Sequence, residues 1–332
     1  MSEKISSTAV LFLITLFDLT GFGLLAFKTG TFDTTAVVIG VFLSGVLLFQ
    51  YNILAAFFKS IDRYVIIIMN FLITVGVMVI YRIDPEIAYK QLIFLIAGLF
   101  VMAGVIYLTI RFTEFKRGRY VLMGMSILIL LMAIVLGNEI GGSKNWISLG
   151  PVSVQPSELV KIVLVLLLAS YFADGSSLKE VWPILVFSAV CMVLLVIQKD
   201  LGAVMLYFGT TLIVYYVCTS NWFVSILGIG AGAGGAVIAY KLFSHIRVRV
   251  AVWKNPWLDY QSYGYQIVQG LLAIASGGLI GVGIGRGMPS LVPARHTDYI
   301  FAVICEEFGL IFGMAILAFY IVLIIRGAII AR

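Results

Sequence analysis

The chain has 332 residues, of which 62% are hydrophobic and 11% are charged, and its net charge at pH 7 is +6. Soluble globular domains carry roughly 25% charged residues, so this composition excludes a water-soluble fold. The cations lie in short loops between apolar runs and form neither a stripe nor a tail, which argues against nucleic-acid binding. Cys191, Cys218 and Cys305 lack paired spacing and indicate neither a disulfide framework nor a metal site.

Ten apolar runs approach the length that crosses about 30 Å of hydrocarbon. They cover residues 9–27, 36–58, 64–81, 91–110, 120–136, 158–173, 182–197, 201–218, 222–241 and 299–325. We therefore expect an all-α, polytopic integral membrane protein with about ten transmembrane helices in one membrane domain, residues 1–332. No small-residue cleavage site follows the first run, which is expected to remain as a membrane helix.

Lysine and arginine residues indicate how these helices are oriented. The cations that fall on one side of the predicted membrane are Lys59, Arg63, Arg111, Lys116, Arg117, Arg119, Lys179, Arg326 and Arg332. Because cytoplasmic loops carry an excess of lysine and arginine, this distribution predicts a cytoplasmic N-terminus.

The two long loops on the opposite side, 137–157 and 242–298, are expected to carry the chemistry, because long ordered loops are usually functional. The glycine-containing parts of the first loop are Gly141-Gly142 and Gly150-Pro151. This loop ends at Pro156, and a proline followed two residues later by Glu158 predicts the start of a helix. In the second loop, the apolar stretch 265–280 is short and contains glycine, which favours an interfacial or re-entrant helix.

The second loop also contains a glycine ladder and a set of cations. The ladder, 281–287, lacks the preceding strand and following helix of a dinucleotide loop, so it predicts close backbone approach to a ligand or a neighbouring helix. The cations in this loop or directly before it, interleaved with Trp253 and Trp257, are Lys241, Arg247, Arg249, Lys254, Arg286 and Arg295. Two interpretations remain open for them: contact with ordinary lipid headgroups, or arginine binding of a diphosphate.

Asp298 lies where this polar loop meets the last apolar run. A carboxylate at the membrane surface is partly desolvated, which makes it a better base near neutral pH. The alternative is a helix N-cap, since aspartate is a favoured cap and an apolar helix follows directly.

Other acidic residues fall within or beside the helices. Glu306 is expected on the same helical face as Asp298, either facing a cavity or paired with a cation of another helix. Glu158 and Lys161 have i, i+3 spacing, which favours a structural pair, although the same pair would suit a polar cavity. Asp200 lies in a tight turn, where a capping role is expected.

Several ordered motifs between residues 82 and 325 closely resemble the shape, elongation, division and sporulation family, whose members include RodA, FtsW and SpoVE. The motifs are Trp146-Ile147-Ser148-Leu149-Gly150, Gln155-Pro156-Ser157-Glu158-Leu159-Val160-Lys161, Gln198-Lys199-Asp200-Leu201-Gly202, Arg247-Val248-Arg249, Asn255-Pro256-Trp257, Pro293-Ala294-Arg295-His296-Thr297-Asp298-Tyr299-Ile300-Phe301 and Glu306-Glu307-Phe308-Gly309. A weaker match is Arg82-Ile83-Asp84-Pro85.

The resemblance implies peptidoglycan glycosyltransfer at the outer face of the bacterial cytoplasmic membrane. Lipid II, a disaccharide-pentapeptide on undecaprenyl diphosphate, would be polymerised into glycan strands, with Asp298 as the catalytic base. The residues expected to bind substrate are Arg247, Arg249, Arg295, His296, Thr297, Trp146, Lys161, Glu158 and Glu306. A divalent cation, Mg or Mn, is an alternative to the arginines at the leaving diphosphate. The expected partners are membrane lipid and a class B penicillin-binding protein, a transpeptidase.

The resemblance covers a core at 64–332 that stops before the family's last helices, and residues 1–63 are expected to add two N-terminal helices. Two other functions compete with the glycosyltransferase. A lipid II flippase would use Glu158, Lys161 and Glu306 to line a passage. A scaffold would only activate a partner enzyme.

Overall fold

The computed structural model describes residues 7–27, 32–58, 61–111, 115–140, 143–149, 152–174 and 177–330. Within these residues, ten helices are long and apolar enough to cross a membrane, which confirms the predicted all-α, multi-pass membrane class. The chain divides into two compact units, Met1–Ile106 with Arg247–Arg332, and Tyr107–Ile246. The predicted single membrane domain, with an extension at 1–63, stays a prediction. Residues named above that lie outside the described ranges are Lys59, Gly141, Gly142, Gly150, Pro151 and Arg332.

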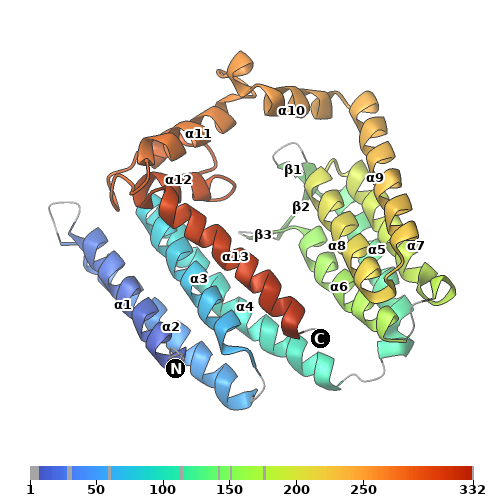
Figure 1. Ribbon diagram of the computed structural model, residues 1–332, viewed down its shortest axis with the longest axis horizontal. Coiled ribbons are helices and arrows are strands. Elements are labelled where there is room, and N and C mark those ends of the chain that lie inside the picture. The colour runs from blue at the N-terminus through green and yellow to red at the C-terminus, as the bar shows by residue number, and fades with distance from the viewer. Residues whose placement is uncertain are drawn as a thin grey trace. The chain divides into compact units, whose positions relative to one another are not determined.

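The first unit begins with long helices that pack side by side (Figure 1). These are α1 (Ser7–Ala26), α2 (Thr34–Phe57), α3 (Arg63–Ile83) and α4 (Pro85–Arg111). α1 packs on both α2 and α3, and Phe22, Leu43 and Met78 are buried between them. Asp33 and Asp62 cap α2 and α3, each accepting two backbone N–H bonds, so the polar turns at these helix ends satisfy the first amides.

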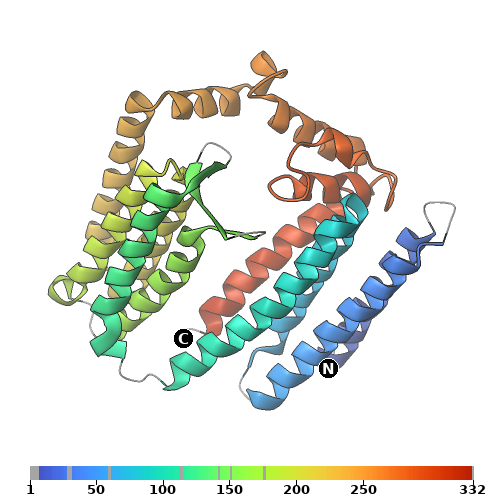
Figure 2. The same cartoon turned by 180° about the vertical axis from the view of Figure 1, so that it is seen from behind.

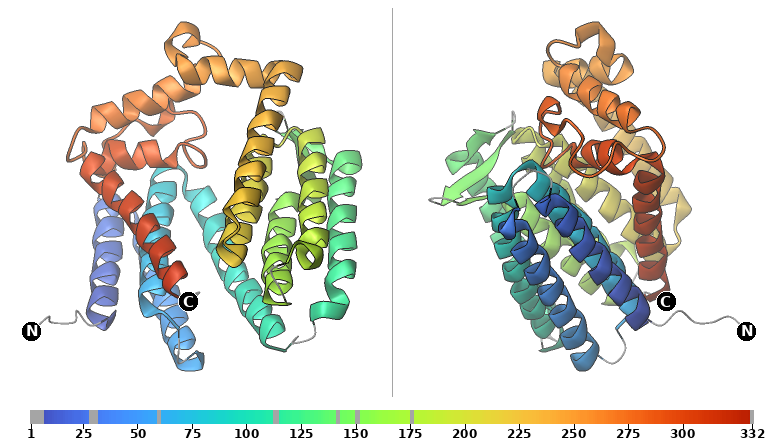
Figure 3. Two further views of the ribbon diagram at one scale, coloured as in Figure 1. Left: turned by 45° about the vertical axis from the view of Figure 1, so that its right-hand side comes forward. Right: turned by 90° about the vertical axis from the view of Figure 1, so that its left-hand side faces the viewer.

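The C-terminal part of the same unit consists of shorter elements that lead to one long helix. These are α10 (Ser244–Lys254), which starts at the boundary between the units, η1 (Pro256–Asp259), α11 (Tyr265–Gly277), η2 (Pro289–Leu291), α12 (Ile300–Phe308) and α13 (Leu310–Ile330). α11 packs against α12, and α12 packs against α3 and α13. Figures 1 and 3 show α11 and α12 at one end of α3 and α13. The helix expected at 265–280 is therefore present as α11, which at 13 residues is too short to cross a bilayer.

The sequence predicts one helix for the apolar run at 299–325, but the structure divides this run into α12 and α13. It breaks at Gly309, whose φ of +89° lies in the left-handed region, and the tenth candidate span is Leu310–Ile330. The amides of Leu310 and Ile311 donate to the carbonyl oxygens of Gly278 and Leu279. The segment that follows α11 thus takes the hydrogen bonds that would otherwise continue α12, and only glycine fits the turn at 309.

The second unit is a bundle of five long helices with a small antiparallel sheet at one end (Figure 2). The helices are α5 (Phe115–Leu136), α6 (Pro156–Asp174), α7 (Leu178–Ile197), α8 (Leu201–Thr219) and α9 (Trp222–Leu242). The sheet has the order β1 (Asn138–Ile140), β2 (Ser143–Leu149), β3 (Val152–Val154). Its core includes Leu164, Leu168, Ile184 and Tyr207. α6 starts at Pro156 as the sequence predicts, whereas the sheet was not predicted.

Candidate active site

Asp298 lies in a tight turn immediately before α12. The carbonyl oxygen of Ala294 accepts the backbone N–H groups of Thr297, at 3.0 Å, and Tyr299, at 3.1 Å. Ala294 has a φ of 49°, an uncommon conformation for a residue other than glycine. The N-cap of α12 is Tyr299, without a side-chain cap bond, and Asp298 is exposed. The structure therefore does not show the N-cap alternative for Asp298, and its carboxylate is open to the surroundings of the chain.

Packing beneath the turn holds it in place. The ring of Tyr299 lies against Gly270 of α11, where an added Cβ would be 2.5 Å from the ring atom Cδ1. Val292, Ala273 and Ala302 form a small buried cluster beside this ring. Burial raises the pKa of Tyr299, and the neighbouring Asp298 carboxylate adds to this shift. The turn that carries the exposed Asp298 carboxylate is therefore held by well-packed side chains of α11 and α12.

The residues that precede Asp298 share its turn. Arg295 is partly buried, whereas His296 and Thr297 are exposed, and the Thr297 hydroxyl donates to the Ala294 carbonyl at 3.3 Å. The turn therefore brings a guanidinium, an imidazole, a hydroxyl and a carboxylate within four consecutive positions. This set has the donors and the acceptor that a sugar diphosphate requires.

Arg247 and Arg249 lie on α10, and both residues are exposed. Trp253 on the same helix is 75% exposed, and Trp257 on η1 is 54% exposed. Tryptophans beside arginines are typical of a segment at the membrane–water interface. Both interpretations of the cations, headgroup contact and diphosphate binding, are compatible with these exposed side chains.

Glu306, expected below Asp298, is buried at the other end of α12. Its Oε1 accepts the backbone N–H of Met288 at 2.9 Å. The adjacent Glu307 forms an ion pair with Arg82 of α3, with 3.2 Å between Nε and Oε1. The ion pair with a cation of another helix is therefore formed by Glu307, whereas Glu306 accepts a hydrogen bond from the loop that contains Met288. The expected contact of Glu306 with substrate stays a prediction.

The other candidate residues belong to the second unit. Lys161 Nζ lies 2.7 and 2.9 Å from the two carboxylate oxygens of Glu158, which confirms the expected pair on α6. Trp146 is partly buried on β2. A role for these three residues in binding substrate stays a prediction.

Asp200 caps α8, as expected, and also anchors the sheet region. Its Oδ1 accepts the N–H of Ala203 at 3.1 Å, and its Oδ2 accepts the side-chain amides of Asn145 at 2.6 Å and Gln155 at 2.9 Å. Sequence reasoning missed these two long-range bonds. The only available signal was that all three residues fall within or beside the family-like motifs.

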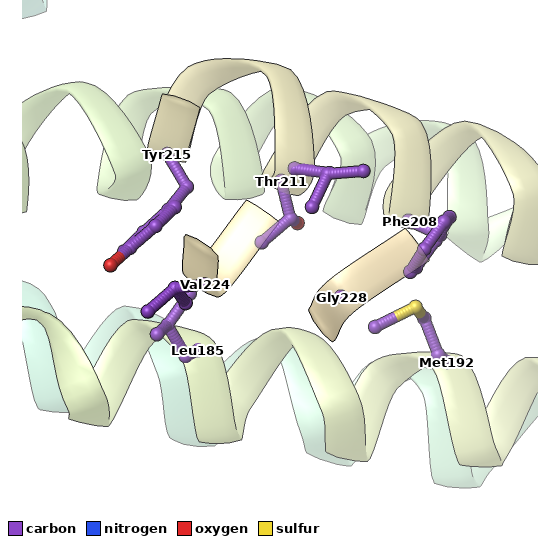
Figure 4. Close-up of a pocket in the computed structure, with 8 residues that line it drawn as sticks. Leu185, Met192, Phe208, Thr211, Tyr215, Val224 and Gly228 are labelled. Carbon is purple, nitrogen blue, oxygen red and sulfur yellow. The ribbon is translucent and has the colours of Figure 1, made fainter. Parts of the chain in front are cut away.

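The second unit also contains a pocket of about 200 Å³ between α7, α8 and α9 (Figure 4). Leu185, Met192 and Phe208 line it, and Thr211 and Tyr215 are its only polar side chains. Without a carboxylate or cation in its lining, it is unsuited to glycosyl or phosphoryl chemistry. Within the described ranges, no cluster of three or more His, Cys, Asp or Glu side chains could hold a metal ion. The divalent cation at the leaving group stays a prediction.

Comparison with known proteins identifies the family. The family model FTSW_RODA_SPOVE, described as a cell cycle protein, matches residues 60–332. The chain belongs to this family. All candidate residues described above lie within the FTSW_RODA_SPOVE match, whereas α1 and α2 precede it.

Two curated members of the FTSW_RODA_SPOVE group are similar in sequence. The chain is 36% identical over 206 residues to peptidoglycan glycosyltransferase RodA of Mycobacterium bovis, covering 57% of this chain and 44% of that protein. It is 34% identical over 253 residues to probable peptidoglycan glycosyltransferase FtsW of Nitrosococcus halophilus, covering 74% and 65%. The chain thus spans less than two thirds of the length of both relatives.

A solved structure supports the fold. The chain is similar, with a TM-score of 0.62 and 26% sequence identity, to a chain in a peptidoglycan synthase complex that coordinates polymerization and crosslinking. The similarity covers 80% of this chain and 77% of the other.

Proposed function

We propose that this protein is a peptidoglycan glycosyltransferase that polymerises lipid II into glycan strands. The observation that carries the proposal is the exposed carboxylate of Asp298, held in one turn with Arg295, His296 and Thr297. The names of the relatives RodA and FtsW support the same activity. The reaction needs a base and a stabilised leaving group, and this turn contains a candidate for each.

In the proposed reaction, Asp298 accepts the proton of the acceptor sugar's 4-hydroxyl as its oxygen attacks the anomeric carbon of the donor. The bond between that carbon and the diphosphate breaks, so one displacement converts the α-linked donor into a β-1,4 linkage. Negative charge develops on the departing undecaprenyl diphosphate. Arg295, Arg247 and Arg249 are the cations proposed to stabilise it, because a planar guanidinium matches phosphate oxygens.

We propose that the reaction takes place at the outer face of the bacterial cytoplasmic membrane, with the N-terminus in the cytoplasm. Arg326, near the end of α13, forms an ion pair with Asp62 at the start of α3, so these two helix ends lie at one level. Arg63 and Arg326 belong to the cation-rich side expected to be cytoplasmic. α12, which follows the Asp298 turn, contacts α3, and its Glu307 pairs with Arg82 at the opposite end of α3.

The proposed partner is a class B penicillin-binding protein. The similar solved chain comes from a complex that performs both polymerization and crosslinking. A polymerase that releases linear glycan requires a second activity to crosslink it, which a transpeptidase supplies.

The test is polymerisation of purified lipid II in proteoliposomes by wild-type protein and by Asp298→Asn. We expect the rate to fall by about 10²–10⁴-fold, the usual contribution of a general base. Asp259→Asn is the matched control, because it removes a carboxylate from the same loop, and its rate should equal that of wild type. Undiminished polymer formation by Asp298→Asn would refute the proposal. Transfer of labelled lipid II without polymer would indicate a flippase instead.

A further inference from the structure

Arg82, at the end of α3, contacts the glycine ladder as well as Glu307. Its Nη2 donates to the carbonyl oxygens of Gly285, at 3.0 Å, and Gly287, at 3.2 Å, while its Nε faces Glu307 at 3.2 Å. The side chains of Arg82 and Glu307 are only 16% and 1% exposed. One guanidinium therefore joins a membrane helix, a loop and α12 in a largely water-free site.

The two glutamates accept hydrogen bonds from the amide groups of the same loop. Glu307 Oε2 accepts the N–H of Gly285 at 3.0 Å, and Glu306 Oε1 accepts that of Met288 at 2.9 Å. The backbone contributes two more bonds, because the N–H groups of Val282 and Gly283 donate to the carbonyl oxygens of Glu306 and Glu307 at 2.9 and 3.0 Å. We call Arg82, Glu306, Glu307 and the loop 282–288 the Arg82 clamp.

The clamp explains the glycine ladder. A Cβ on Gly287 would lie 2.9 Å from Cγ of Glu307 and 3.0 Å from Cδ of Glu306. Gly281 has a φ of +84°, and a Cβ there would collide with the backbone of Glu307. The predicted close backbone approach is therefore an approach to the end of α12, where side chains would separate the loop from the two acids.

Two segments of the chain connect the clamp to Asp298: the helix α12 and the loop that precedes Asp298. α12 has nine residues, a length of about 13 Å. It has Glu306 and Glu307 near its last residue, and Asp298 lies two positions before its first. The loop from Met288 to Asp298 starts at the clamp as well. A shift of the clamp therefore moves Asp298 from both sides.

We propose that Arg82 is a positioning residue, which through Glu307 and the loop 285–288 sets the location of Asp298 for the reaction; this inference rests on the proposed function. A buried ion pair is weak evidence for net stability, because desolvation offsets much of its attraction. Its geometric effect is larger, since a base misplaced by about 1 Å loses about 100-fold in rate.

The experiment measures kcat and KM for lipid II in proteoliposomes for Arg82→Ala, Arg82→Lys and Glu307→Gln. We expect Arg82→Ala to lower kcat by about 100-fold with KM unchanged, because the substrate still binds while the base is displaced. Arg82→Lys should recover part of kcat, since it keeps the charge but loses the planar guanidinium that reaches the two carbonyl groups through Nη2 and Glu307 through Nε. Glu307→Gln should lower kcat in the same manner.

The matched control is Arg326→Ala, which removes an ion pair from the other end of α3. Arg326 Nε lies 2.9 Å from Asp62 Oδ2, and these side chains are 31% and 13% exposed. Its kcat should equal that of wild type even if its unfolding temperature falls. Hydrogen exchange of the peptide that contains the Gly285 and Met288 amides should accelerate in Arg82→Ala and not in Arg326→Ala.

Three results would overturn the inference: wild-type kcat in Arg82→Ala, an equal loss of kcat in both arginine variants, or a rise in KM without a change in kcat. If Arg82→Ala does not fold, Arg82→Lys and Glu307→Gln decide by the same criteria. An active Asp298→Asn protein would refute the proposed function itself. Inactive Asp298→Asn beside fully active Arg82 variants would refute only the clamp.

Discussion

Replacing Asp200 by alanine should destabilise the second unit by about 4 kcal/mol. The N-cap bond to Ala203 contributes about 1 kcal/mol. Hydrogen bonds to charged groups contribute about 1.5–3 kcal/mol each, and we use the lower value because Asp200 is partly exposed. The two bonds from Asn145 and Gln155 therefore add about 3 kcal/mol. Asn145 is itself 3% exposed, so its amide would lose its partner without gaining water.

Denaturant unfolding in detergent, followed by far-UV circular dichroism, measures this loss. The control is Asn221→Ala, which removes the N-cap of α9 in the same unit, where the side chain accepts only the bond from Val224. That variant should lose about 1 kcal/mol. The difference between the two variants isolates the bonds that anchor the residues around the sheet. Equal losses for the two caps would refute the reasoning.

Two further predictions concern the first unit. Gly309→Ala should destabilise the protein by more than about 1 kcal/mol, measured by thermal unfolding, because φ is +89° and the loop backbone leaves no room for a Cβ; a neutral effect would contradict the break between α12 and α13. Tyr81→Phe removes the hydrogen bond that, with two backbone amides, holds the pKa of Asp33 below its ordinary value. A carboxylate whose pKa is lowered by folding stabilises the folded protein at pH values above its ordinary pKa near 4, and this stabilisation is lost as the pH falls through the lowered pKa. The difference in unfolding temperature between wild type and Tyr81→Phe should therefore be largest near neutral pH and shrink in acid. A difference that stays constant from pH 7 to pH 3 would count against this account.

Local features of the molecule were predictable from the residues alone. A span such as 201–218 corresponds to α8, Leu201–Thr219, because an apolar run in a bilayer must satisfy its own backbone hydrogen bonds as a helix. The cap at Asp200 and the pair of Glu158 with Lys161 were predictable for the same reason, since each depends on residues within one helical turn.

The break at Gly309 was not predictable from hydropathy. An apolar run with one glycine continues as a helix unless something competes for its hydrogen bonds. Here the competitor is the segment after α11, whose carbonyl groups accept the amides of Leu310 and Ile311. The choice between the two roles considered for Asp298, helix cap and exposed base, was also not predictable from the sequence. The turn that exposes its carboxylate depends on packing against α11.

By itself, the sequence determined the membrane class and the places of most helices, because each depends on residues adjacent in the chain. Only the tertiary structure decided that Arg82 meets Gly285, 203 positions away, and that Asn145 meets Asp200, 55 positions away. Such contacts form when several helices pack at once, and no periodicity along the chain specifies which polar groups then become neighbours.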